Sequence, residues 1–280
     1  MAAGRGDAMA GPSLAPHRLR RILILAPHPD DEIVVCGIAA RHARAKGAEI
    51  FVLFLTTGVP PRETLWAWRR SNYNRRVERR REEALAAMRQ LGAQPAGFLD
   101  LPSRGLIASL DTAAAVLEQV LRETRAGELW VTAFEGAHQD HDAANALAAN
   151  FRDRLPVWEF AAYNFAGAKV RSNRFPDARG GVVELRLSRE EGRLKRRMLA
   201  LYASESGNLS HIRVEQEAWR PLPRYDYVGP PHPGTLFRER FHWVSLRHPR
   251  IDLTPSAEVY AALAAWNATA RLDTNSAADG

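Results

Sequence analysis

Short apolar runs alternate with helix-like stretches up to residue 165, and this alternation constrains the fold more than any other feature. The apolar runs lie at 21–26, 49–58, 96–102, 128–134 and 156–165. Continuous apolar strands joined by helices are typical of a parallel sheet that is covered on both faces. The pattern therefore predicts an α/β protein with a Rossmann-like, doubly wound, mostly parallel sheet and helices on both faces.

Beyond residue 165 the alternation weakens. A strand is expected over 180–188, a helix over 189–204 and a last helix over 255–270, with a stretch rich in Pro, His, Trp and Tyr between the two helices. A stretch of that kind commonly lies over a sheet or lines a cleft. The expected organisation is a flexible leader over 1–20, a single domain over 21–270 whose 206–270 part covers the cleft, and a flexible tail over 271–280.

Composition narrows the class of protein. No apolar run could span a bilayer, and the N-terminal stretch lacks the apolar region of a signal peptide, which predicts a cytoplasmic protein. Cys36 is the only cysteine, which excludes an internal disulfide and a multi-cysteine zinc site. Its apolar helical setting favours a small buried residue over a nucleophile.

The basic residues do not indicate a nucleic-acid partner. The formal net charge is +7, but the arginines of 74–84 are interleaved with glutamates, as on a solvated helix face. We therefore expect no nucleic-acid binding.

Polar side chains gather directly after the first and fourth apolar runs. His28, Asp30 and Asp31 follow the first, and a second cluster over 136–142 leads into a helix expected over 141–152. In a doubly wound sheet of order 3-2-1-4-5 the first and fourth strands are neighbours, and ligands bind where their carboxyl ends flank the switch point. The strand count therefore predicts that the two loops face each other across one crevice.

The residue types in these loops suit a metal. Zinc in hydrolases commonly takes three ligands drawn from His and Asp or Glu and leaves one position open, and the remaining polar groups can take or give a proton. Taken alone, an Asp-Asp pair before a helix is commonly a cap, and a His-x-x-His loop is commonly a surface loop. The two clusters together favour a metal site at the C-terminal ends of strands one and four.

The stretches APHPDDE (26–32) and HQDH (138–141) together resemble the signature of the LmbE/PIG-L family of zinc-dependent deacetylases. The resemblance covers most of 20–205. It implies a bound Zn²⁺, with Fe²⁺ as the alternative native metal, and removal of the acetyl group from N-acetylglucosamine-type compounds.

The family's roles carry over to the matching positions. The resemblance implies metal ligands at His28, Asp31 and His141. It implies a general base at Asp30 that takes a proton from the attacking water. It also implies that His138 stabilises the oxyanion or protonates the leaving amine, with Asp140 orienting it and favouring its charged form.

Two candidates for substrate binding follow from comparison with the family pattern. Relatives carry an aspartate after the third strand that contacts sugar hydroxyls, whereas Ser103, followed by Arg104, stands at that place here. An arginine that meets the sugar is expected within 79–81; Arg80 is favoured, and the alternative is that all three are helix-surface charges.

Further candidates lie outside that pattern. His232, on the Pro-rich loop GPPHPG, is a candidate to reach the site, and the alternative is a structural or solvated loop histidine. Trp66, with Trp68, is expected to form a substrate lid or an oligomer contact. Trp219 and Tyr225 are candidates for an apolar or sugar-stacking wall, and the alternative for Trp219 is a buried core aromatic.

The expected function is metal-dependent hydrolysis of the acetamide of an N-acetylglucosaminyl-type small molecule or glycoconjugate. One alternative is an amidase of the same mechanism that acts on a non-sugar N-acyl compound. A second alternative, from another class, is a non-catalytic basic module that binds nucleotides or nucleic acid. A homo-oligomer is compatible with the sequence.

Overall fold

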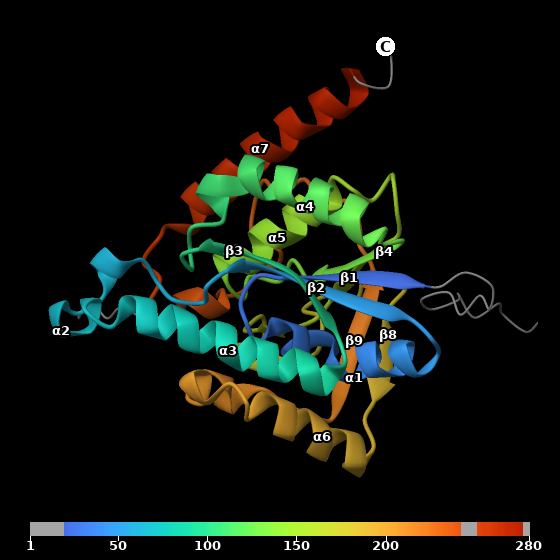
Figure 1. The fold of residues 1–280 in the computed structure, drawn as a ribbon. Helices are drawn as coiled ribbons and strands as arrows, with labels where there is room; N and C mark the ends of the chain where they lie inside the picture. The colour runs from blue at the N-terminus through green and yellow to red at the C-terminus, as the bar shows by residue number, and fades with distance from the viewer. Residues whose placement is uncertain (1–19, 242–250, 277–280) are drawn as a thin grey trace, which may run out of the picture.

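A central sheet of seven strands organises the structure (Figure 1). The computed structural model describes residues 20–241 and 251–276. The strands of the sheet are β1 (Arg21–Ala26), β2 (Glu49–Thr56), β3 (Gln94–Leu101), β4 (Glu128–Thr132), β5 (Val157–Phe160), β8 (Val183–Arg186) and β9 (Gln216–Pro221). They lie in the order β3-β2-β1-β4-β5-β9-β8. The first five pair in parallel, and β9 pairs antiparallel with both β5 and β8.

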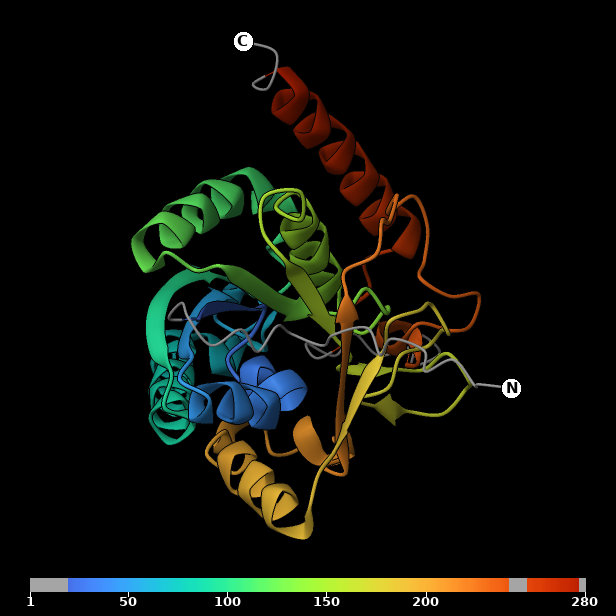
Figure 2. The same ribbon diagram turned by 90° about the vertical axis from the view of Figure 1, so that its right-hand side faces the viewer.

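Helices cover both faces of this sheet. The α-helices are α1 (Asp31–Ala45), α2 (Ala67–Arg70), α3 (Tyr73–Leu91), α4 (Leu110–Thr124), α5 (Gln139–Ala149), α6 (Arg189–Leu199) and α7 (Ser256–Ser276). Short 3₁₀ turns lie at Arg62–Thr64, Ile107–Ser109, Ala203–Glu205, Leu209–His211 and Phe237–Glu239. Helices α1, α3 and α6 lie on one face, and α4, α5 and α7 lie on the other (Figures 1 and 2). The predicted doubly wound α/β class and the order of its first five strands are confirmed.

Each face of the sheet buries its own apolar cluster, because successive residues of a strand point to opposite faces. Leu23 and Leu25 of β1 belong to the cluster beneath α4 and α5. Ile22 and Ile24 belong to the cluster beneath α1 and α3. The continuous apolar strands seen in the sequence are thus explained by burial on both sides, as parallel sheets require.

Helix α1 is interrupted at Cys36, whose φ of −141° lies outside the helical range. The backbone N–H groups of Ile38 and Ala39 donate to the carboxylate of Glu217 on β9, at 2.9 and 2.7 Å. Lys195 of α6 donates to the same carboxylate at 2.8 Å, and both charged side chains are fully buried. Cys36 is buried as predicted, and burial raises the pKa of its thiol. The interruption is therefore stabilised by a buried ion pair from two other elements.

Several boundaries differ from the expected ones. The run 156–165 forms β5 and then β6 (Tyr163–Asn164), which pairs with β7 (Arg171–Ser172) in a separate two-stranded sheet. Helix α5 begins at Gln139 rather than near 141, because His138 caps it.

The ends of the chain also differ from expectation. The last helix continues to Ser276, so residues 271–276 of the expected tail are helical. The expected leader, apart from residue 20, lies outside the described residues. Within 206–270, strand β9 extends the sheet, so this part does more than cover a cleft. No helix in the described ranges has the length and apolar character needed to cross a membrane.

Candidate metal centre

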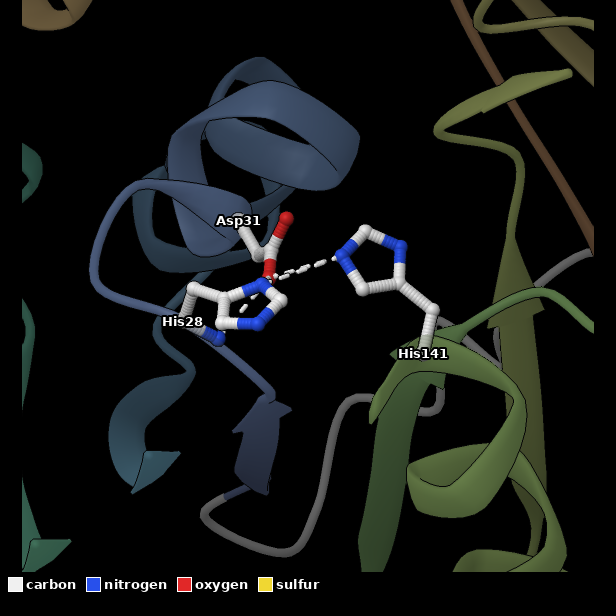
Figure 3. A group of neighbouring side chains, drawn as sticks. All are labelled: His28, Asp31 and His141. Carbon is white, nitrogen blue, oxygen red and sulfur yellow. Dashed lines mark hydrogen bonds and ion pairs between the residues drawn. The ribbon is translucent and has the colours of Figure 1, made fainter. Parts of the chain in front are cut away.

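The loops that follow β1 and β4 meet at the carboxyl edge of the sheet. β1 and β4 are parallel neighbours, with Leu25 opposite Val131. His28 comes from the β1–α1 connection, Asp31 from the start of α1, and His141 from the first turn of α5. Figure 3 shows the three side chains pointing toward one another from these elements. The convergence predicted from strand order is therefore present.

Three potential ligand atoms form a nearly equilateral triangle. Asp31 Oδ2 lies 3.2 Å from His28 Nδ1 and 3.2 Å from His141 Nε2. The two nitrogens lie 3.3 Å apart. All three side chains are buried.

This triangle has the dimensions of a metal site. Tetrahedral zinc bonds of about 2.0–2.1 Å place neighbouring ligand atoms about 3.3 Å apart. The donor set of two imidazoles and one carboxylate is also that of hydrolytic zinc sites with an open position. His28, Asp31 and His141, the residues that the family resemblance implied, thus form a group that could hold a metal ion.

Asp140 fixes the orientation of His28. Its Oδ2 lies 3.0 Å from His28 Nε2. When Nε2–H donates to this carboxylate, the lone pair of the imidazole is on Nδ1, the atom that faces Asp31 and His141. Burial lowers the pKa of His28, but hydrogen bonds to Asp140 and Asp31 outweigh it and raise the pKa to about 10. Metal binding must therefore displace a proton from this imidazole.

Among the imidazoles, that of His28 lies closest to Asp140. The family resemblance had implied instead that Asp140 orients His138. Asp140 Oδ2 is 3.5 Å from His138 Nδ1, and that nitrogen instead accepts the backbone N–H of Asp140 at 3.1 Å. Asp140 acts to raise the pKa of His138, in the direction that the family resemblance implied. Burial lowers the pKa of His138 to about 3, and the nearby Asp140 does not compensate.

Asp30 adopts a backbone conformation that side chains rarely take. Its φ is 126° and ψ is −27°, directly before α1. Such strain persists only where the surroundings impose it, and it concentrates at functional sites. Glu32 contributes here, because its Oε2 accepts the backbone N–H of Asp30 at 3.1 Å. Burial raises the pKa of Asp30 to about 7, although Arg80 acts to lower it.

Arg80 lies behind Asp30 rather than on the helix surface. It is 3% exposed, so the alternative of a surface charge is excluded for this residue. Its Nη2 donates to Asp30 Oδ2 at 3.1 Å and to the carbonyl oxygen of Pro29. Gly58 leaves the space for this guanidinium, since a Cβ at Gly58 would lie 2.7 Å from Nη2.

Ser103 and Arg104 touch the site through Asp140. Ser103 Oγ lies 3.4 Å from both His28 Nε2 and Asp140 Oδ2, and the residue is buried. The backbone N–H of Arg104 donates to Asp140 Oδ2 at 2.6 Å. The loop after β3 is therefore attached to the candidate centre by a carboxylate from α5.

His232 contacts its own loop, and Trp66 contacts its neighbour Trp68. His232 Nδ1 accepts the backbone N–H of Gly234 at 3.2 Å within its own loop. The ring of Trp66 stacks on Trp68, with centroids 5.3 Å apart, and Trp68 is 70% exposed. Trp219 belongs to the core, where it stacks on Phe160.

Sequence reasoning missed Tyr163, which contacts His141, and Glu135, which holds the backbone of Tyr163. Tyr163 of β6 packs the edge of its ring against His141, with centroids 5.5 Å apart. Glu135 is fully buried and accepts the backbone N–H groups of Ala162 and Tyr163, at 2.6 and 3.1 Å. An acidic residue directly after an apolar strand was the only sequence signal for Glu135, and Tyr163 carried none.

Comparison with protein families gives one match in this region. The family model described as GlcNAc-PI de-N-acetylase (PIG-L) matches residues 23–151. This range contains both loops of the candidate centre.

Two curated enzymes are similar in sequence. The 1D-myo-inositol 2-acetamido-2-deoxy-alpha-D-glucopyranoside deacetylase 1 of Catenulispora acidiphila is 32% identical over 49% of this chain and 49% of the enzyme. The deacetylase of the same substrate name from Streptomyces avermitilis is 30% identical over 60% of this chain and 67% of the enzyme. The chain thus spans about half the length of the first enzyme and two thirds of the second.

A solved structure supports the fold. The zinc-inhibited form of teicoplanin deacetylase matches 74% of this chain and 99% of its own, with a TM-score of 0.56 and 18% identity. At this identity the likeness concerns the architecture alone.

Proposed function

The chain belongs to the PIG-L family, and on that premise we propose that it is a metal-dependent N-deacetylase. The proposed substrate is a small molecule or glycoconjugate that carries an N-acetylglucosaminyl group, and the products are a free amine and acetate. The names of the two curated relatives support this class of substrate. The observation that carries the proposal is the triangle of His28 Nδ1, Asp31 Oδ2 and His141 Nε2, with sides of 3.2 to 3.3 Å.

We propose Zn²⁺ as the ion held by these three residues, with Fe²⁺ as the alternative. When bound, the ion would supply a Lewis acid that polarises the amide carbonyl and acidifies water. Asp140 holds the His28 imidazole in the orientation that such a site needs, at 3.0 Å from Nε2.

Asp30 is proposed as the general base. Its carboxylate would take a proton from the water whose oxygen adds to the amide carbon. A base is most effective when its pKa lies near the working pH, and burial places the pKa of Asp30 at about 7. Arg80, 3.1 Å from Asp30 Oδ2, keeps this carboxylate in place.

His138 is proposed to stabilise the oxyanion. Its ring packs edge-on against His28, with centroids 4.6 Å apart, and its side chain is partly exposed. The Nε2–H of the neutral imidazole would donate a hydrogen bond to the oxyanion, and the departing nitrogen would take the proton that Asp30 removed from water.

One observation favours the non-sugar alternative. Ser103, which replaces the aspartate of relatives, is 5% exposed and lies against His28 and Asp140. It therefore offers little free surface to a sugar hydroxyl. A cytoplasmic location and a homo-oligomeric state stay predictions.

Elemental analysis paired with amine release tests the proposal. We expect about one zinc per chain and chelator-sensitive amine release from N-acetylglucosamine conjugates. Alanine at His28, Asp31 or His141 should remove the metal. Asp30→Asn should keep it and lose most turnover.

The outcomes separate the alternatives. Zinc with turnover of non-sugar amides only would select the amidase. A carefully purified protein without metal that binds polyanions in a salt-sensitive manner would select the basic binding module.

A further inference from the structure

Helix α5, which carries His141, is held from behind by the C-terminal segment (residues 236–241 and 251–263). This segment lies outside residues 23–151, which the family model matches. Helices α5 and α7 pack against each other on the same face of the sheet (Figure 2). Beside the apolar core that Val259 and Leu263 join, buried polar contacts link the first turn of α5 to this segment.

The first contact joins the segment to Gln139. The side-chain amide of Gln139 donates to Asp252 Oδ2 at 2.7 Å and to Thr254 Oγ1 at 3.3 Å. Asp252 Oδ1 accepts the backbone N–H of Thr254 at 3.1 Å, which fixes the carboxylate. Gln139 and Asp252 are both at most 5% exposed, so water cannot readily replace these hydrogen bonds.

The second contact joins the segment to Asp142. The hydroxyl of Tyr260 donates to Asp142 Oδ2 at 3.0 Å, and Arg238 Nη1 lies 3.7 Å from the same oxygen. Asp142 Oδ1 accepts the backbone N–H of Gly136 at 3.2 Å. The carboxylate thus connects α7 to the loop that leads into α5.

The first turn of α5 therefore faces two ways. Asp140 and His141 point to the candidate centre, where they contact His28 and Asp31. Gln139 and Asp142 point to the C-terminal segment. Since the four residues are consecutive on one rigid turn, a rotation or shift of the helix would break contacts on both sides.

We propose that Asp252 and Tyr260 are positioning residues for the metal centre, acting through Gln139 and Asp142. This inference rests on the proposed function, because it concerns the geometry of the same three ligands. Metal sites are sensitive to such support: loss of an outer partner of a ligand commonly costs about 10–100-fold in affinity or activity.

Helix α7 itself offers a matched control. Trp266 Nε1 donates to Asp111 Oδ1 of α4 at 2.7 Å. Helix α4 carries none of the candidate site residues. Trp266→Phe therefore removes a hydrogen bond between α7 and α4 and leaves the hydrogen bonds between the C-terminal segment and α5 in place. Asp252→Asn and Tyr260→Phe are equally conservative, because each removes one acceptor or one donor at nearly constant shape.

The experiment measures zinc affinity by chelator competition, the melting temperature of the metal-free protein, and kcat and KM separately. We expect Asp252→Asn and Tyr260→Phe each to weaken zinc binding about 10-fold and to lower kcat more than KM. Trp266→Phe should lower the melting temperature without changing zinc affinity. Thr254→Val replaces Asp252→Asn if that variant does not fold.

The result that overturns the inference is a loss of zinc affinity no greater than that of Trp266→Phe. A wild-type protein that binds no zinc would overturn the proposed function itself, and the inference with it. The two failures are thus distinguished by the wild-type measurement alone.

Discussion

Asp140 Oδ2 lies 3.0 Å from His28 Nε2, so a carboxylate from the first turn of α5 orients an imidazole from the loop after β1. The same carboxylate also accepts the backbone N–H groups of Arg104 and Leu106, at 2.6 and 3.3 Å. One side chain therefore ties three loops of the sheet edge together at the candidate centre.

Replacing Asp140 should weaken metal binding although Asp140 is not itself among the three proposed ligands. In Asp140→Asn, an amide can present a donor to His28 Nε2, which favours the wrong tautomer. We expect zinc affinity to fall about 10–100-fold. Chelator competition measures it, and an unchanged affinity would show that His28 keeps its orientation without Asp140.

Removing the positive charge behind Asp30 should shift the pH profile. Arg80 lowers the pKa of Asp30, so Arg80→Met should raise it, by about 1 unit. A base must be deprotonated to act, and the acid limb of kcat/KM should therefore move to higher pH. Profiles from pH 5 to 9 measure this. Arg81→Met is the control, because Arg81 pairs with the half-exposed Asp100; equal shifts in both variants would contradict the role of Arg80.

Glu32 should make the metal-free protein less stable as pH rises. Burial raises its pKa to about 8, although hydrogen bonds from Tyr202 and the backbone oppose the shift. The folded state then holds a proton that the unfolded state releases near pH 4.5. The contribution of Glu32 to stability is thus present at low pH and falls as pH rises toward 8.

The Glu32→Gln variant tests whether Glu32 makes the stability fall as the pH rises. The melting temperature of this variant relative to that of the wild type should rise between pH 5 and 8. In this range only the wild type releases a proton from residue 32 when it unfolds, so only the wild type loses stability as the pH rises. The exposed Glu82→Gln is the control and should show a constant difference. A constant difference in Glu32→Gln as well would mean that Glu32 is already ionised in the folded protein.

The buried pair of Glu217 and Lys195 should be strongly coupled. Removing either partner alone leaves an unpaired buried charge, and Glu217→Gln or Lys195→Met should each cost about 3–5 kcal/mol of unfolding free energy. The double variant Glu217→Gln, Lys195→Met should cost less than the two single losses combined. Urea unfolding measures all three; strict additivity would rule out the coupling.

Much of the fold was predictable because local chemistry and global packing agree over the first 165 residues. Apolar runs such as 21–26 can be satisfied only by burial on both sides, which demands a parallel sheet with two helical layers. From strand order alone the loops of His28 and His141 had to meet. The boundaries that were wrong, such as the start of α5, depend on a single cap at His138.

The supporting residues were not predictable, because nothing local marks them. Arg80 could have faced solvent or Asp30, and only the packing of α3 against the loop at Gly58 places it inward. Tyr163 reaches His141 because the chain bends after β5, and Asp252 reaches Gln139 from more than 100 positions away along the chain.

The three proposed metal ligands were named from a family resemblance, but by itself the sequence determined the parallel sheet and the meeting of the two polar loops. Hydrophobic periodicity and strand order carry that information, and both are local or nearly so. The tertiary structure alone decided which imidazole Asp140 orients, how Asp30 is held and what supports α5 from behind. Those outcomes depend on hydrogen bonds between side chains distant in sequence, whose partners are fixed only when packing brings them within about 3 Å.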